Sequence, residues 1–173
     1  MKKCLILIVL LTFCCAGLAS ATTLTPGVWD KFFFGSEGTA VTETYDFTVG
    51  AGYSLYVTDA YNIGDQFEVY DGLTLLGTTN FVAYDPSSPI NPNEDQTLVQ
   101  SAYDSGLYSV GEFALSAAAY TDINLVALLS PYGAGGAYIK IDQTSAPVPE
   151  PATWILMGTG LAGLAWYRRR KSA

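Results

Sequence analysis

Residues 53–79, YSLYVTDAYNIGDQFEVYDGLTLLGTT, decide the fold. Apolar and polar side chains alternate along residues 66–69, and residues 53–58 and 73–78 are further short segments of strand-forming composition. Turn-forming residues separate the three segments, at residues 62–65 and at Asp71-Gly72. The order of these segments predicts a three-strand meander made of residues 53–59, 66–71 and 73–79.

The same strand signals recur on both sides of this stretch. Residues 45–49 and 137–142 alternate apolar with polar side chains, and residues 28–34, 111–116 and 123–129 are further strand candidates. Turn signals lie between them, at Asp85-Pro86, at residues 89–92 and in the glycine-rich residues 133–136. Short strands at regular spacing, with no strong helical stretch, predict an all-β body over residues 22–146, an antiparallel β-sandwich or jelly roll.

The charges of the chain are strongly segregated. All 16 acidic residues lie between Asp30 and Glu150, and the only basic residues in that interval are Lys31 and Lys140, so its net charge is −14. Affinity for nucleic acids comes mainly from Lys and Arg contacts with phosphates. The composition therefore argues against nucleic-acid binding and favours a soluble body that is repelled by anionic surfaces.

The amino terminus has the pattern of a secretory signal peptide over residues 1–21. Two lysines precede an apolar run of 12 residues, 4–15, and Ala19 and Ala21 give the small-x-small pattern of a signal-peptidase cleavage site. Cleavage there predicts a mature start at Thr22. A retained anchor is disfavoured, because a bilayer-spanning helix needs about 20 residues. A lipoprotein signal is disfavoured because Phe13, which is not small, precedes Cys14.

The carboxy terminus predicts a transmembrane helix over residues 152–167. These 16 residues carry no charge, and the aromatic residues Trp154, Trp166 and Tyr167 lie at the two ends, where membrane interfaces would be. The cations of residues 168–171 follow directly and would stay on the cytoplasmic side. A buried helix of the body is the alternative, but the segment lacks the polar face that such a helix shows.

Residues 147–173 resemble the PEP-CTERM sorting signal of Gram-negative bacteria, in which a Pro-Glu-Pro motif, a short apolar helix and a basic end follow one another. The residues that carry the resemblance are Pro149, Glu150, Pro151, Arg168, Arg169 and Arg170. The resemblance implies recognition and cleavage by an exosortase, an integral-membrane transpeptidase, and association with exopolysaccharide and biofilm matrix. The Pro-Glu-Pro residues would then be acted upon and would not form an active site.

This resemblance implies a route for the protein. It predicts an exported chain held transiently in the inner membrane by its carboxy-terminal helix and then delivered to the cell surface or extracellular matrix after processing. The arrangement of residues 53–79 and 130–142 is also similar to a β-sandwich body of other proteins with this tail, which implies a fold and no activity.

The sequence argues against an enzyme. It contains no histidine, and its three cysteines lie in the predicted signal peptide, so nucleophile–histidine pairs and the usual zinc sites are excluded from the mature chain. A glycosidase would need two carboxylates that face one sugar bond, and no spacing singles out such a pair. We therefore expect neither catalysis nor an obligatory cofactor.

Calcium is the one metal for which the sequence offers candidates. Asp59, Asp65, Glu68 and Asp71 gather around predicted turns, and oxygen ligands in loops are what calcium uses. Their spacing does not match an EF-hand, and Asp before Gly is also ordinary turn chemistry. Solvated turns therefore remain the alternative to a calcium site.

Two hypotheses for the body follow. In the first, it is a structural, non-enzymatic component of the surface matrix. In the second, it is a carbohydrate-binding module, with or without calcium, that holds the exopolysaccharide. The second rests on aromatic residues at predicted strand ends and loops, which could stack on sugar rings: Tyr61, Tyr84, Tyr103, Tyr108 and Tyr132.

Overall fold

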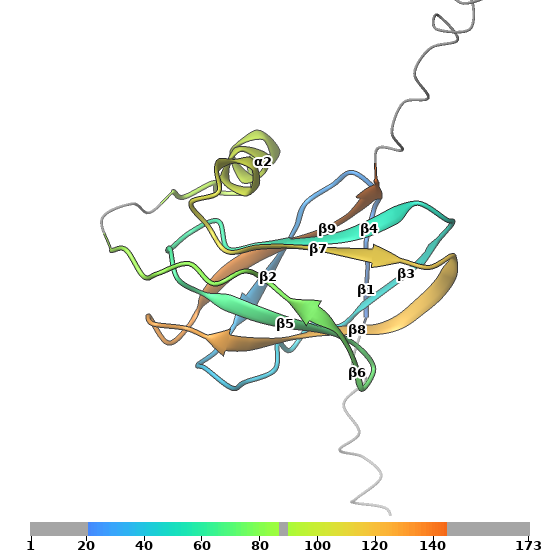
Figure 1. Ribbon diagram of the computed structural model, residues 1–173, viewed down its shortest axis with the longest axis horizontal. Helices are drawn as coiled ribbons and strands as arrows, with labels where there is room; N and C mark the ends of the chain where they lie inside the picture. The colour runs from blue at the N-terminus through green and yellow to red at the C-terminus, as the bar shows by residue number, and fades with distance from the viewer. Residues whose placement is uncertain (1–20, 87–89, 145–173) are drawn as a thin grey trace, which may run out of the picture.

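The computed structural model describes residues 21–86 and 90–144, and these form a sandwich of two β-sheets (Figure 1). One sheet has the strand order β1-β3-β8-β5-β6 and the other the order β2-β9-β4-β7. All strand pairs are antiparallel except β1 with β3. The strands are β1 (Thr22–Thr23), β2 (Asp30–Phe34), β3 (Tyr45–Val49), β4 (Tyr53–Thr58), β5 (Gln66–Asp71), β6 (Thr74–Thr78), β7 (Val110–Leu115), β8 (Ala118–Leu129) and β9 (Gly135–Gln143). The prediction of an all-β fold is confirmed.

Alternation along the strands builds the core between the two sheets. In β3 the side chains of Tyr45, Phe47 and Val49 are buried, whereas Thr48 between them is exposed. Aromatic rings join the two sheets across this core: the Phe67 ring of β5 lies 5.4 Å from that of Phe32 and 4.9 Å from that of Phe34, both on β2. Edge-to-face packing of this kind adds to the stabilisation from burial alone.

The predicted meander is wrong, because only two of its three strands are neighbours. β5 and β6 form the expected hairpin, in which Asp71 pairs with Thr74 and the chain turns at Gly72 and Leu73. β4 instead pairs with β7 and β9 in the other sheet. The β4–β5 loop carries the chain across from one sheet to the other, and alternation within a strand cannot reveal such a crossing because it reports only which face is buried.

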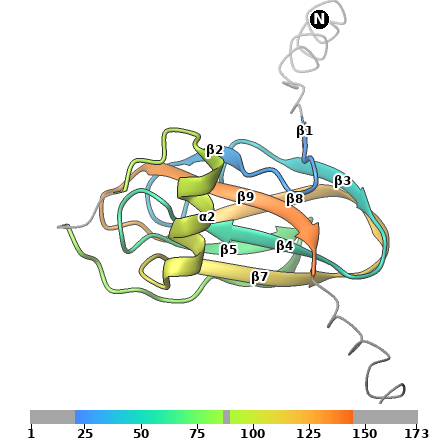
Figure 2. The ribbon, with the colours of Figure 1, turned by 90° about the horizontal axis from the view of Figure 1, so that it is seen from above.

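One helix, α2 (Gln96–Ser105), was not predicted. Asp95 caps its amino end by accepting the backbone N–H groups of Thr97 and Leu98, and Gly106 ends it in the left-handed conformation that glycine adopts readily. Only Val99 and Ala102 are buried on it, so its sequence lacks a strong apolar stripe. The helix lies across the outer face of the sheet formed by β2, β9, β4 and β7 (Figure 2).

Other strand boundaries also differ from prediction. β8 begins at Ala118, five residues before the predicted segment, and Gly135 and Gly136 start β9 and do not lie in a turn. Within residues 21–86 and 90–144, no helix is both long and apolar enough to cross a membrane.

The predictions for residues 1–20 and 145–173 lie outside the described residues. These are the signal peptide with Ala19, the Pro149-Glu150-Pro151 motif, the helix over residues 152–167 and the cations that follow it. Ala21, the predicted last residue of the signal peptide, directly precedes β1. Thr22 is anchored there by donating its backbone N–H to the carbonyl of Thr44 at 2.8 Å.

Candidate functional site

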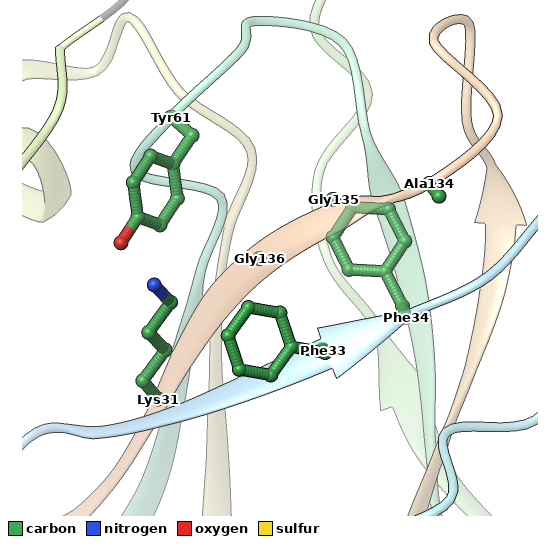
Figure 3. A pocket seen from close by; sticks show the side chains of 7 residues that line it. All are labelled: Lys31, Phe33, Phe34, Tyr61, Ala134, Gly135 and Gly136. Carbon is green, nitrogen blue, oxygen red and sulfur yellow. The ribbon is translucent and has the colours of Figure 1, made fainter.

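An aromatic hollow of about 460 Å³ lies on the outer face of the second sheet, where β2 and β9 meet the β4–β5 loop (Figure 3). Its walls are mainly carbon, with one cationic side chain reaching into it. We call it the aromatic hollow, and it is lined by Lys31, Phe33, Phe34, Tyr61, Ala134, Gly135 and Gly136.

Strand register explains why these residues meet. In the antiparallel pair of β2 and β9, Phe33 lies opposite Gly136 and Lys31 lies opposite Tyr138. Phe32 and Phe34 point into the core, so Lys31 and Phe33 must point outward. The Lys31 Nζ lies 4.7 Å from the centre of the Phe33 ring and 4.8 Å from the centre of the Tyr61 ring. Such cation–π contacts hold the ammonium group between the two rings.

Gly136 leaves room for the side chains of Lys31 and Tyr61 beside β9. A Cβ atom at this position would lie 3.1 Å from Cε of Lys31 and 3.2 Å from Cε2 of Tyr61. Any side chain would therefore push the lysine stem or the tyrosine ring away from β9. The absence of a side chain leaves the floor of the hollow flat.

A polar hollow of about 340 Å³ adjoins the aromatic one and shares Lys31 and Phe33 with it. Glu94 lines it beside Lys31, whereas the side chain of Asp30 lies on the inner side of β2, like Phe32, near Tyr45 and Glu43. Burial raises the pKa of Asp30, and a backbone hydrogen bond partly opposes that effect. We call the two hollows together the groove. The polar hollow is lined by Trp29, Asp30, Lys31, Phe33, Glu94, Gln96 and Tyr138.

The polar hollow is held in shape by hydrogen bonds from three elements. The hydroxyls of Tyr61 and Tyr138 are 2.9 Å apart, and the two rings are stacked. The backbone N–H of Glu94 donates to the Tyr138 hydroxyl at 3.2 Å. Burial and the bond to Tyr61 raise the pKa of Tyr138 to about 12, so this hydroxyl stays neutral at ordinary pH.

Helix α2 is fastened beside the groove through glutamine side chains. The Trp29 backbone N–H donates to Oε1 of Gln96 at 2.7 Å, and Nε2 of Gln96 donates to the Trp29 carbonyl at 3.0 Å. The indole N–H of Trp29 donates to Oε1 of Gln100 at 3.1 Å. These bonds fix the segment that leads into β2, and with it the position of Lys31 and Phe33.

The two lysines of the body have different surroundings. Lys140 is nearly buried, lies over the rings of Trp29 and Tyr56, pairs with Asp142 at 3.3 Å and donates to Gln100 at 3.0 Å. Lys31 forms no ion pair with another described residue. Lys31 is therefore the cation of the body that is available to a ligand.

The four acids predicted as calcium ligands divide into two groups. Asp59 and Asp65 are buried together in the β4–β5 loop, where the Asp65 backbone N–H donates to Oδ2 of Asp59 at 3.2 Å. Glu68 instead accepts the Tyr70 hydroxyl at 2.7 Å on β5, and Asp71 ends that strand in the hairpin. Across the described parts of the chain, no three acidic, histidine or cysteine side chains are grouped to hold a metal ion.

The Asp59–Asp65 pair has one oxygen without a partner. Ser130 faces Asp65 and lowers its pKa, yet neither Oγ of Ser130 nor Oδ1 of Asp65 has a partner at hydrogen-bond distance within the described residues. Burial raises the pKa of Asp59 to about 8, with repulsion from Asp65 as the next cause, and burial raises that of Asp65 to about 6.

The predicted sugar-stacking tyrosines also separate. Tyr61 lines the aromatic hollow, and exposed Tyr84 packs edge-on against exposed Tyr132 at 5.3 Å. Tyr103 and Tyr108 belong to the small core beneath α2. Lys31 and Phe33 were not predicted as site residues. The outward side of the strand at residues 28–34 was the signal that could have found them, since the apolar run Phe32-Phe33-Phe34 must turn one ring to solvent.

Comparison with known proteins finds one family model that matches part of the chain. The family model described as "PEP-CTERM protein-sorting motif" matches residues 147–171, as the resemblance of the tail predicted. No curated protein matches the chain. The chain is therefore an exported protein of predominantly β structure that carries a PEP-CTERM sorting motif. This motif implies anchoring in the membrane through the carboxy terminus and then processing by an exosortase.

Proposed function

We propose that the protein is a structural, non-enzymatic component of the cell surface or extracellular matrix, released to that location when an exosortase cleaves its tail. The observation that carries this proposal is the order of parts along the chain. The last described strand, β9, ends at Gln143, and the sorting motif begins at residue 147. A cut within the motif would free the whole sandwich without removing a strand.

The chemistry of the sequence supports a role without catalysis. It has no histidine, and the mature chain predicted to begin at Thr22 has no cysteine. Its charge of −14 between Asp30 and Glu150 favours a body that stays hydrated and separate from anionic surfaces. These properties suit a protein embedded in a hydrated polymer.

The test is the mass of the surface form, compared with the mass of the membrane form, in a bacterium that encodes an exosortase. A surface mass that begins at Thr22 and ends near Glu150 supports the proposal and both terminal signals. A surface form that retains Ala173 contradicts it, since the tail would then be a permanent anchor.

The second candidate is a carbohydrate-binding module that holds the exopolysaccharide, and the aromatic hollow favours it. Sugar-binding surfaces commonly combine an exposed aromatic ring with nearby groups that bond hydroxyls. Phe33 offers such a ring, with 59% of it exposed, and Lys31 lies beside it. Retention of the full-length protein by a matrix polymer in a pull-down, with loss of retention in Phe33→Ala, would favour this function.

A further inference from the structure

We propose that the aromatic hollow and the polar hollow together bind a neutral glycan across at least two sugar rings. This inference rests on the second candidate function above, and it names the ligand class and the subsites. The two hollows share Lys31 and Phe33, so they form one continuous surface and not two separate sites. Their volumes are about 460 and 340 Å³.

The aromatic hollow supplies the stacking subsite. Phe33 is exposed and adjoins the flat glycine floor at Gly136, opposite which it lies in the strand register. One face of a sugar ring presents C–H groups, which pack on an aromatic face through dispersion and removal of water. Tyr61 closes the other side and is held by its hydroxyl bond to Tyr138.

The polar hollow supplies the subsite that recognises hydroxyls. The Lys31 ammonium offers three donors, whereas the carboxylate of Glu94 offers acceptors. A sugar hydroxyl both donates and accepts, so it can bond both kinds of group at once. Gln96 plays no direct part, because its amide is already bonded to the backbone of Trp29.

The charges favour a neutral ligand over a polyuronate. Lys31 is one cation, and the carboxylate of Glu94 in the same polar hollow offsets its charge. The interval from Asp30 to Glu150 carries −14, so an anionic polymer would be repelled along most of its length. A neutral polymer escapes this repulsion and can still bond every polar group of the groove.

The groove also has the right position for a polymer outside the cell. β9 begins at the aromatic hollow with Gly135 and ends at Gln143, shortly before the tail (Figure 1). Eight steps along a strand span about 26 Å at roughly 3.3 Å per residue. The aromatic hollow therefore lies near the end of β9 that is remote from the tail.

The experiment is affinity electrophoresis of the full chain in non-ionic detergent, in native gels that contain one polymer each. The neutral polymers are hydroxyethyl cellulose, laminarin, dextran and galactomannan, and the polyuronate is alginate. We expect at least one neutral polymer to retard the wild type and alginate not to do so. Phe33→Ala and Lys31→Gln should each weaken that retardation by about tenfold in dissociation constant, as loss of a central contact does.

The matched control is Phe81→Ala, which removes another exposed ring, 66% exposed, outside the groove. It should bind like the wild type, and unchanged melting temperatures would show that all three variants are folded. Absence of retardation by every neutral polymer overturns the inference, and so does tighter binding of alginate. Neutral binding that survives both groove variants overturns the groove and leaves the carbohydrate-binding function standing. Surface delivery is measured separately by mass, so its failure is distinguishable from either result.

Discussion

Asp59 accepts the backbone N–H of Asp65 through Oδ2 at 3.2 Å, and this places two buried carboxyl groups in one short loop. Oδ1 of Asp59 accepts the N–H of Tyr61 at 3.4 Å, so the carboxylate organises the whole β4–β5 loop. Gly64 of the same loop has φ +121°, and a Cβ atom there would lie 2.9 Å from Cα of Tyr84. The β4–β5 loop, which connects the two sheets, is thus organised by hydrogen bonds to Asp59 and contains the buried pair Asp59 and Asp65.

The first prediction is that stability falls as pH rises. The pKa of Asp59 is raised to about 8 and that of Asp65 to about 6, both mainly by burial. A carboxyl whose pKa is higher in the folded chain binds its proton more tightly there. The stabilisation of the folded state by this proton is therefore complete below about pH 4. It is lost as the pH rises to about 6 for Asp65 and to about 8 for Asp59. Each group contributes a slope of at most about 1.4 kcal/mol per pH unit.

The measurement is urea unfolding between pH 4 and 8 in the presence of EDTA. Asp65→Asn should flatten the decline, because it removes one titrating group and the repulsion on the other. Glu37→Gln, which changes an exposed acid in the β2–β3 connection, should leave the slope as it is. A wild-type free energy of unfolding that stays constant or rises between about pH 4 and pH 8, where Asp59 loses its proton, would contradict the raised pKa values.

The second prediction concerns calcium, which stays a hypothesis for the same pair. If Asp59, Asp65 and the unpartnered Ser130 hydroxyl hold the ion, calcium should raise the melting temperature of the wild type and not that of Asp65→Asn. Because Glu68 and Asp71 are placed elsewhere on β5, Glu68→Gln and Asp71→Asn should keep the calcium effect. Absence of any calcium effect on the wild type ends the hypothesis.

The third prediction tests the aromatic contact between the sheets. Phe67 is fully buried and its ring meets Phe32 and Phe34 of the opposite sheet edge-on. Phe67→Ala should lower the free energy of unfolding by about 3–5 kcal/mol, because it leaves a cavity in the core. Chemical denaturation gives the value, and Phe81→Ala, which truncates an exposed ring, should change it by less than about 0.5 kcal/mol. Equal effects of the two variants would mean that the sheets do not pack through Phe67.

The fourth prediction tests the attachment of α2. Gln96→Ala removes both hydrogen bonds to the Trp29 backbone, which are partly buried, and should cost about 1–3 kcal/mol. Hydrogen exchange should rise in residues 96–105 and at Trp29, with the core strands unaffected. Ser101→Ala, on the exposed side of the helix, is the control and should leave exchange unchanged. Protection that survives Gln96→Ala would show that packing alone holds the helix.

Sequence patterns predicted the strands well because alternation is a local property. Residues 45–49 and 53–58 were predicted with the bounds of β3 and β4. β3 buries one face and exposes or half-buries the other, whereas β4 has buried residues on both faces and was recognised by its composition. The Asp71-Gly72 turn was also readable, because Gly72 has φ +57° and the hairpin needs that conformation there.

The features that were missed depend on distant parts of the chain. The pairing of β4 with β7 and β9 requires strands 50 or more residues further on. Helix α2 has little apolar character of its own. It is stabilised by hydrogen bonds between Gln96 and Trp29, which are 67 residues apart in the sequence. The groove likewise needs β2, the β4–β5 loop and β9 together. Local composition showed that aromatic residues were available, but not that Phe33 would be the exposed one.

The last prediction concerns the tail, whose sorting motif matches residues 147–171. Glu150 is the charged residue of the Pro-Glu-Pro motif, and we expect it to be the side chain that the enzyme recognises. Glu150→Ala should stop processing in a bacterium that encodes an exosortase. The full chain would then accumulate in the membrane fraction, with Ala173 retained in its mass.

Two further variants separate recognition of the motif by the exosortase from effects on folding and export. Glu112→Ala changes an exposed acid on β7 and should be processed like the wild type. Glu150→Asp keeps the charge and tests whether recognition needs the length of the side chain as well. If Glu150→Ala reaches the surface in a shortened form, the cut does not depend on this glutamate. The enzyme would then recognise the segment through features that follow it, such as the cations Arg168, Arg169 and Arg170.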